Sequence, residues 1–223
     1  MIIDQSVFVQ TPKVSVLMPV FNTQENHLRE AIESVLSQSY SDFEFLILND
    51  ASTDANVERV VKTYDDSRII YSINEKNLGI SASRNKLIDM ANGEYLAIVD
   101  HDDISHPERF AEEVAYLEKH PETGLVSSIM ESVGNEEPKL WNVPEQSLDI
   151  KKQLLVECCF YHPACMIRKS VLIENNVRYE PLFSPSEDHA LFCRLIHKTE
   201  FYNIQKVLLY YRNHPGNTTH LKA

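Results

Sequence analysis

The sequence predicts one α/β domain with a doubly wound, mostly parallel central sheet, and three observations support this fold class. Strand-like and helix-like segments alternate from about residue 13 to residue 120. The chain has 223 residues, of which 43% are hydrophobic, and this is enough for one large core. Polar residues directly follow several of the strand-like runs, as expected at the ligand-binding edge of such a sheet.

Four short apolar runs in the first half have the composition of buried strands. We expect Pro19 to end the first of them, because proline has no N–H to donate to a neighbouring strand. The four predicted strands cover residues 14–18, 43–48, 68–73 and 94–99.

Helical patterns lie between and after these strands. Apolar residues from Leu28 to Leu36 repeat at helical spacing and predict an amphipathic helix. Further helices are expected over residues 54–64 and 81–91, and another follows residue 107. The expected caps and stops are Thr53 before the second helix, Gly93 after the third, and Pro107 and Pro121 around the fourth.

The alternation weakens after Gly124, so a smaller and less regular C-terminal part is expected. A loop is predicted around residues 134–144, and it is followed by a helix over 148–156 and a strand over 164–167. A last helix is predicted over 187–197. We expect residues 1–223 to form a single domain with two halves, at about 13–120 and 121–223.

The net charge of -12 argues against a nucleic-acid partner, because binding to a polyanion requires a positive surface. An acidic protein that binds phosphates needs local positive charge, from a few arginines or from a metal ion.

The four cysteines, Cys158, Cys159, Cys165 and Cys193, form no C-x-x-C pair and are expected to be small buried hydrophobes in a reducing compartment. Residues 1–4 lack the basic start of a signal peptide, and no apolar run is long enough to cross a membrane. We therefore expect a cytoplasmic protein, with peripheral membrane association left open.

The acidic segment Asp100-His101-Asp102-Asp103 follows the fourth predicted strand directly. Three neighbouring carboxylates repel one another unless a positive group lies among them. Together with a phosphate they suit Mg²⁺ or Mn²⁺, which prefer oxygen ligands. A helix-capping loop before Pro107 is the alternative.

Two further segments have a chemical and a structural interpretation. Asp50 ends the second strand and could accept a hydrogen bond from a nucleotide base, or belong to an ordinary strand–helix junction. Gly79 permits a tight turn before a helix whose N-terminus favours an anion. Arg84 in that helix could reach a phosphate or the aspartates, or lie on the surface.

The segment Glu187-Asp188 begins the last predicted helix, where the helix dipole stabilises acidic residues. A carboxylate at this place could instead act as a general base. His162 and His214 flank this part of the chain, and each is either a structural histidine or a contact to phosphate or metal.

Taken in order, five segments resemble those of the family 2 glycosyltransferases, which are inverting enzymes with the GT-A fold, a Rossmann-like arrangement. The resemblance covers nearly the whole chain, and five segments in register are far more specific than any one of them. They are VSVLMPVFN (14–22), NDASTD (49–54), NLGISASRN (77–85), DHDD (100–103) and EDHAL (187–191).

The resemblance implies a nucleotide-binding half at about 13–120, an acceptor-binding half at about 121–223, and a Mn²⁺ or Mg²⁺ cofactor. It implies that Asp188 is the catalytic base and that Asp102 is the main metal ligand, with His214 as a second. The implied nucleotide and donor contacts are Pro19, Phe21, Asn22, Asp50, Arg84, Asp100 and His101, and the implied acceptor and diphosphate neighbours are His162, Glu187 and Arg212.

The implied reaction moves a sugar from a nucleoside-diphosphate donor, with a UDP-sugar expected, to a hydroxyl of a glycan or lipid-linked acceptor. Bacterial surface-polysaccharide synthesis is the expected setting. Asn49, Ala51, His101 and Phe192 depart from the commonest family pattern, and these departures leave the choice of donor open.

Three other functions remain possible from the sequence. A metal-dependent phosphohydrolase also uses an Asp-x-Asp strand end, although usually at the first strand, with Thr or Val following the motif. A dinucleotide oxidoreductase is disfavoured because the five glycines include no G-x-G-x-x-G. An inactive nucleotide-sugar binding module is disfavoured because both Asp102 and Asp188 are present.

Overall fold

The computed structural model describes residues 11–134, 139–214 and 217. In this part of the chain an eight-stranded sheet has the order β3-β2-β1-β4-β7-β6-β8-β5. The strands are β1 Val14–Val20, β2 Phe43–Asn49, β3 Ile69–Ile73, β4 Tyr95–Ile98, β5 Ile104–Ser105, β6 Thr123–Gly134, β7 Met166–Arg168 and β8 Glu200–Asn213.

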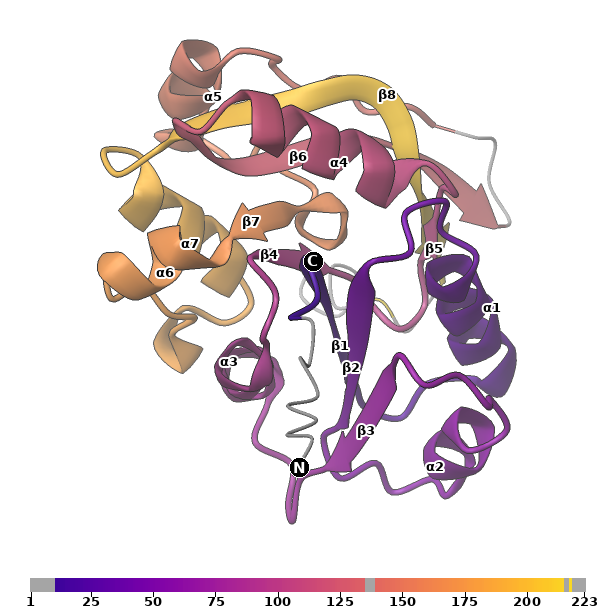
Figure 1. Ribbon diagram of the computed structural model, residues 1–223. Helices are drawn as coiled ribbons and strands as arrows, with labels where there is room; N and C mark the ends of the chain where they lie inside the picture. Colours follow the sequence, from indigo (N-terminus) through magenta and orange to yellow (C-terminus); the bar gives the residue numbers. More distant parts are fainter. Residues whose placement is uncertain (1–10, 135–138, 215–216, 218–223) are drawn as a thin grey trace, which may run out of the picture.

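Helices cover both faces of the sheet (Figure 1). They are α1 Glu25–Leu36, α2 Asn56–Val61, α3 Ile80–Met90, α4 Arg109–Lys119, α5 Ser147–Leu154, α6 Lys169–Glu174 and α7 Glu187–Leu195, with short 3-10 turns η1 His162–Ala164 and η2 Pro181–Phe183. One apolar cluster packs α1, α2 and α4 against one face. A second cluster packs α3, α5, α6 and α7 against the other face.

The predicted fold class is confirmed. β3, β2, β1 and β4 are parallel neighbours, and β6 and β8 are also parallel. β7 pairs antiparallel with β4 and β6, and β5 pairs antiparallel with β8. Every residue of β1, β2 and β4 is buried, which explains why these strands appear in the sequence as continuous apolar runs.

Pro19 does not end the first strand as predicted, because β1 continues to Val20. Leu17 O accepts from Val99 N and Val20 O accepts from Asp50 N, so the backbone of β1 alternates between its two neighbours. Pro19 therefore faces β4, whose pairing with β1 has already ended at Leu17. No strand N–H is required at this position, and the proline is tolerated.

Two predicted helix caps are also wrong. The second helix begins only at Asn56, and Thr53 instead donates from Oγ1 to Asn22 Oδ1 at 3.1 Å. The third helix is capped by Ala91. Gly93 is needed for a close approach, since a Cβ atom there would lie 2.5 Å from Ser15 N.

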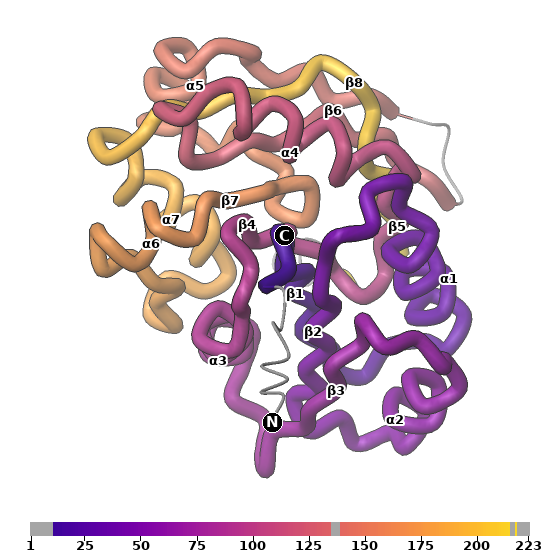
Figure 2. The backbone as a smooth tube through the Cα atoms, viewed as in Figure 1, coloured from indigo at the N-terminus to yellow at the C-terminus, as the bar shows by residue number. Residues whose placement is uncertain are grey.

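The second half is more regular than predicted, because β6 and β8 are strands of 12 and 14 residues that run side by side. Their register shifts near Ser128 and Ile129, and such irregularities blur the alternation on which strand prediction depends. Figure 2 shows β8 crossing the molecule and turning beside β5 and α1. Of the predicted 134–144 loop, residues 135–138 lie outside the described residues, and Leu140 bridges to Glu131.

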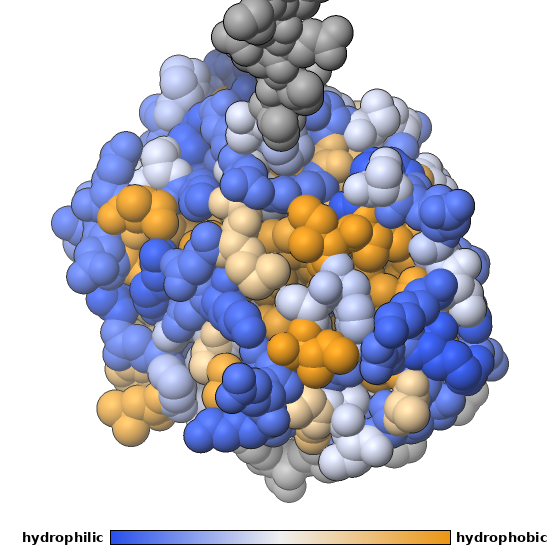
Figure 3. Space-filling model, turned by 60° about the horizontal axis from the view of Figure 1, so that its bottom comes forward, coloured by the Kyte–Doolittle hydropathy of each residue, from blue (hydrophilic) through white to orange (hydrophobic). Residues whose placement is uncertain are grey.

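β3 forms one edge of the sheet, and its Ile70 and Ile73 are exposed. Apolar side chains gather on the face of the molecule that carries this edge (Figure 3).

Cys159 and Cys165 are buried as predicted, but Cys158 and Cys193 are exposed, and all four thiols are free. Among the described residues, no helix has both the length and the apolar character needed to cross a membrane. Residues 1–4, on which the expectation of no signal peptide rests, lie outside the described residues.

Candidate functional site

The carboxyl ends of β1 and β2 meet because the strands are in register as far as Val20 and Asn49. Pro19 is buried in β1, and the two residues that follow the end of this strand, Phe21 and Asn22, are exposed. Asn22 joins the two strand ends: its N–H donates to Ser52 Oγ at 3.1 Å, and its Oδ1 accepts from Thr53 N at 2.9 Å. Phe21 therefore stands on a fixed turn with part of its ring open to solvent.

Asp50 is buried at the end of β2 and organises the turn before α3. Its Oδ1 accepts from Asn74 Nδ2 at 2.7 Å and from Leu78 N at 2.9 Å, and its Oδ2 accepts from Gly79 N at 2.9 Å. Gly79 has a φ of +82°, which favours glycine. Because a carboxylate offers about four lone pairs, Oδ2 can accept one more hydrogen bond.

The acidic loop after β4 is tied to the end of β8. Arg212 donates from its backbone N to Asp103 Oδ1 at 2.9 Å and from Nε to Asp102 O at 2.9 Å. His214 Nε2 lies 2.9 Å from Asp102 Oδ2. Asp103 is buried, and burial, reinforced by Asp102 and Asp100, raises its pKa well above the usual range. Asp103 thus braces the loop against β8, and Asp102 faces His214.

Asp102 and His214 present an oxygen and a nitrogen donor side by side, with side chains 15% and 19% exposed. No group of three His, Cys, Asp or Glu side chains in the described part of the chain could hold a metal ion by itself. Mg²⁺ and similar hard ions commonly take one or two carboxylates and complete their coordination with substrate phosphates. The two side chains fit an ion that binds together with a diphosphate.

Arg84 in α3 lies between the two acidic groups of the site. Its guanidinium is 3.2 Å from Asp100 Oδ1 and 3.0 Å from Glu187 Oε1, and its side chain is 8% exposed. It also lies 5.6 Å from the centre of the Tyr179 ring. Burial alone would lower the pKa of Arg84, but the surrounding groups, Asp100 first, raise it overall. This arginine links the acidic loop after β4 to the start of α7.

Asp188 lies in the first turn of α7, as predicted, and Glu187 precedes it. Asp188 Oδ1 accepts from His189 N at 2.7 Å. Burial raises the pKa of Asp188, although this hydrogen bond and Arg84 oppose the shift. A carboxylate whose pKa is raised in this way is better suited to accept a proton near neutral pH.

The remaining predicted residues differ in placement. His162 is buried and lies 2.8 Å from the hydroxyl of Tyr179, and burial, reinforced by Arg84 and Arg109, holds its pKa well below the usual range. Its partner Tyr179 also lies against Arg84, so His162 is related to the site through Tyr179. His101 is half-buried within the acidic loop.

Other residues of the site carried no motif in the sequence. Asn74 donates to Asp50 and follows the end of β3, so it could have been found as another polar residue at a strand end. Glu30 and His27 in α1 contact Arg212 and His214. They look like ordinary surface residues of an amphipathic helix, and only the fold brings them to the site.

A cavity of about 710 Å³ lies elsewhere, between α5 and residues 196–200. Its lining includes Leu148, Lys151 and His197 but none of the residues described above at the carboxyl edge. The chemistry-bearing groups therefore line the edge of the sheet and not this cavity.

Comparisons with known proteins agree with this geometry. The sequence model of glycosyl transferase family 2 matches residues 15–175. An uncharacterized glycosyltransferase of Methanocaldococcus jannaschii is 34% identical over 207 residues, which are 90% of this chain and 71% of that protein.

Solved structures share the fold. S. aureus TarS 1–349 in complex with UDP-GlcNAc has a TM-score of 0.76 at 23% identity, over 95% of this chain and 61% of that one. The mannosyltransferase PcManGT from Pyrobaculum calidifontis, in complex with GDP-Man and Mn²⁺, has a TM-score of 0.68 at 18% identity, over 95% of this chain and 59% of that one.

Proposed function

Because the chain belongs to glycosyl transferase family 2, we propose that it moves a sugar from a UDP-sugar to a hydroxyl of a glycan or lipid-linked acceptor. One observation carries this proposal. The guanidinium of Arg84 is bonded to both Asp100 and Glu187, so the acidic loop and the base candidate Asp188 lie at one site. Donor and acceptor chemistry therefore have a common centre.

UDP is the proposed nucleotide. The complexes of TarS with UDP and UDP-GlcNAc support this choice, as does the remaining lone pair of Asp50, which suits the N–H of a uracil edge. The exposed ring of Phe21 stands at the same strand ends and offers an apolar wall for the base, and Pro19 is buried in the strand that leads to it. Asn22 fixes the turn that carries Phe21, and Asp100 and His101 lie in the loop that would meet the ribose and the sugar.

Asp102 and His214 would hold a Mn²⁺ or Mg²⁺ ion, and the Mn²⁺ in the mannosyltransferase complex supports this proposal. A bound cation would supply positive charge next to the departing diphosphate. Arg212 lies against the same loop and adds fixed positive charge there. These groups address the need for local positive charge in a protein of net charge -12.

Asp188 is the proposed general base. As the acceptor oxygen attacks the anomeric carbon, its proton passes to a carboxylate oxygen of Asp188. The bond between the anomeric carbon and the diphosphate oxygen breaks on the opposite face, and the bonding electrons leave with the nucleoside diphosphate. The configuration at the anomeric carbon inverts.

Arg84 takes a different part from the one the family resemblance implies. Both of its terminal nitrogens are already bonded to carboxylates, and it is buried over Tyr179. We assign it to positioning the donor loop relative to α7. Glu187 supports it directly, and His162 supports it through the hydroxyl of Tyr179. The role in bacterial surface-polysaccharide synthesis stays a prediction.

A thermal-shift panel of UDP, GDP and ADP, with their sugars and with or without Mn²⁺, tests the proposed function. We expect UDP and a UDP-sugar to raise the melting temperature, with a larger shift when Mn²⁺ is present. A larger shift with GDP than with UDP would indicate that the donor is a GDP-sugar. The absence of any shift with all three nucleotides would reject the proposed function.

A further inference from the structure

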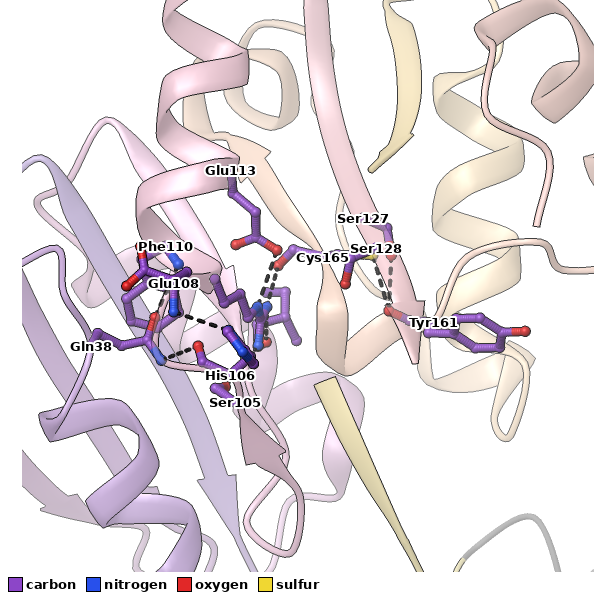
Figure 4. A network of polar contacts seen from close by, with 12 residues as sticks. Gln38, Ser105, His106, Glu108, Phe110, Glu113, Ser127, Ser128, Tyr161 and Cys165 are labelled. Atoms are coloured by element: carbon purple, nitrogen blue, oxygen red, sulfur yellow. Dashed lines mark hydrogen bonds and ion pairs between the residues drawn. The ribbon is translucent and has the colours of Figure 1, made fainter. Parts of the chain in front are cut away.

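Arg109 and Glu113 form an ion pair in the middle of the protein, away from the groups assigned above. Both side chains are 0% exposed, and they lie one turn apart on α4, with Arg109 Nε 3.1 Å from Glu113 Oε1. Figure 4 shows Glu113, Ser105 and Cys165 gathered around one point between α4 and the sheet. None of the reaction steps proposed for this enzyme uses this pair.

The guanidinium of Arg109 bonds to three separate segments of the chain. It donates from Nη2 to Ile98 O at 2.9 Å and to Cys165 O at 3.3 Å, and from Nη1 to Ser105 Oγ at 3.2 Å. Ile98 is the last residue of β4 and Ser105 is the last residue of β5. The acidic residues Asp100 to Asp103 lie between them, so one side chain holds both ends of the acidic loop.

The two carbonyls held by Arg109 lie where strand pairing ends. β4 and β7 are paired only from Tyr95 to Ala97, so the carbonyl groups of Ile98 and Cys165 lie just beyond this ladder. Ile98 N donates to Cys165 O at 2.9 Å, but Cys165 N donates to His162 O and not back to Ile98 O. Buried carbonyls need a donor, and Arg109 supplies one for Ile98 O and a second, longer one for Cys165 O. The chain can leave the sheet here and turn into the acidic loop without losing these hydrogen bonds.

Packing alone does not require an ion pair at this position. A buried ion pair is often no more stabilising than apolar side chains of similar volume. Glu113 Oε2 has no hydrogen-bond partner among the described residues, and burial raises the pKa of Glu113 to about 7 despite the neighbouring Arg109. An apolar residue in place of Arg109 could fill the space, but it could not bond to both ends of the loop.

We propose that Arg109, oriented by Glu113, is a positioning residue that fixes the two ends of the acidic loop and thereby sets the affinity for the cation. The loop also leaves the sheet next to Gln38, which donates to His106 O at 2.7 Å and accepts from Phe110 N at 3.0 Å (Figure 4). The segment after the loop is therefore held by both Gln38 and Arg109, whereas the Ile98 end is held by Arg109. This inference rests on the proposed function.

The test compares Arg109→Lys with wild type and with Glu44→Gln. Lysine keeps the charge but cannot bond to Ile98, Cys165 and Ser105 in the geometry of a guanidinium. Glu44 is a matched control because it is buried, accepts from Ser15 Oγ and Asn92 N at 2.6 Å, and lies at the opposite end of the strands.

Two readouts are measured in each protein. They are the hydrogen exchange of amides 99–104 without ligand, and the affinity for Mn²⁺ at saturating UDP, followed by electron paramagnetic resonance. We expect Arg109→Lys to speed exchange in the loop and to weaken Mn²⁺ about tenfold, as loss of a group that orients a metal ligand commonly does. Glu44→Gln should leave both readouts unchanged.

Unchanged loop exchange in Arg109→Lys, or equal losses in Arg109→Lys and Glu44→Gln, would overturn the inference. If Arg109→Lys does not fold, Ser105→Ala removes one of the hydrogen bonds of Arg109. It should also speed exchange in the loop and weaken Mn²⁺ binding, each by about two- to threefold. If wild-type protein binds UDP and Mn²⁺ and the variants have the same loop exchange and the same Mn²⁺ affinity as wild type, this inference alone is rejected. Wild-type protein that binds neither ligand rejects the proposed function, and the exchange readout still tests the positioning role.

Discussion

The two acidic groups of the site are held in very different ways. Asp102 and Asp103 are bonded to Arg212 in β8 and to His214 just after it, and their loop is anchored at both ends by Arg109. Asp188 is preceded by the turn η2, in which Leu182 is 88% exposed. Beyond its own helix, the start of α7 is joined to the acidic loop through Arg84 and Glu187.

Under the proposed function, this difference separates a fixed donor side from a more open acceptor side. A nucleoside diphosphate has one geometry, so contacts that fix its site in advance reduce the ordering cost of binding. An exposed segment before the base leaves the shape of the acceptor side to be completed by the acceptor. Changes on the two sides should therefore have separable effects on nucleotide binding and on transfer.

Asp188→Asn should produce the largest change. Transfer should fall by about 10²- to 10⁴-fold, the usual contribution of a general base, whereas UDP affinity should stay at the wild-type value. Release of UDP in the presence of acceptor measures the rate, and calorimetry measures the affinity. Asp149→Asn, an exposed aspartate in α5, is the control. Normal transfer by Asp188→Asn would assign the base elsewhere.

Arg84→Met should break the connection between the two sides. It leaves Asp100 and the buried Glu187 without their partner, and breaking a buried pair commonly costs about 3–5 kcal/mol in the free energy of unfolding. Urea denaturation measures the loss. The double variant Arg84→Met/Glu187→Gln should lose less than the sum of the two single variants. Additive losses would mean that the two side chains are not coupled.

Glu113→Gln should change how stability depends on pH. Burial raises the pKa of Glu113 from 4.5 to about 7, so the folded protein holds a proton that the unfolded chain has released between these values. This group's contribution to stability is present below pH 4.5 and is lost as pH rises to about 7. The stability of the variant relative to wild type should therefore increase over this range. A constant difference in urea midpoints would contradict the raised pKa.

Ala51→Gly should have the smallest effect and should sharpen the view of the donor side as held under strain. Ala51 has a φ of +57°, and this conformation costs a non-glycine residue about 1–2 kcal/mol. Glycine relieves this strain, but part of the relief is offset by the greater conformational freedom of glycine in the unfolded chain. We expect a net stabilisation of about 0.5–1 kcal/mol by urea denaturation. Ala55→Gly, at a φ of -64°, should destabilise instead.

The first half of the fold and the order of the motifs could be predicted from the sequence because β1, β2 and β4 are short, apolar and closely followed by polar residues. β6 and β8 could not, since their shifted register hides the alternation of buried and exposed residues. Arg109 appears in the sequence as a charged helix residue. Its burial depends on the ends of β4, β5 and β7 meeting beneath α4, and no local pattern records that contact.

The most direct test of a preformed, metal-dependent donor side is the calorimetric affinity for UDP with and without Mn²⁺, in wild type and in Asp102→Asn. Mn²⁺ should tighten UDP binding by about tenfold in wild type, roughly 1.4 kcal/mol, because a cation held by Asp102 would also bind the negatively charged diphosphate. In Asp102→Asn the same Mn²⁺ concentration should leave UDP affinity unchanged. Equal tightening in both proteins would remove Asp102 from the metal site and contradict the proposed donor geometry.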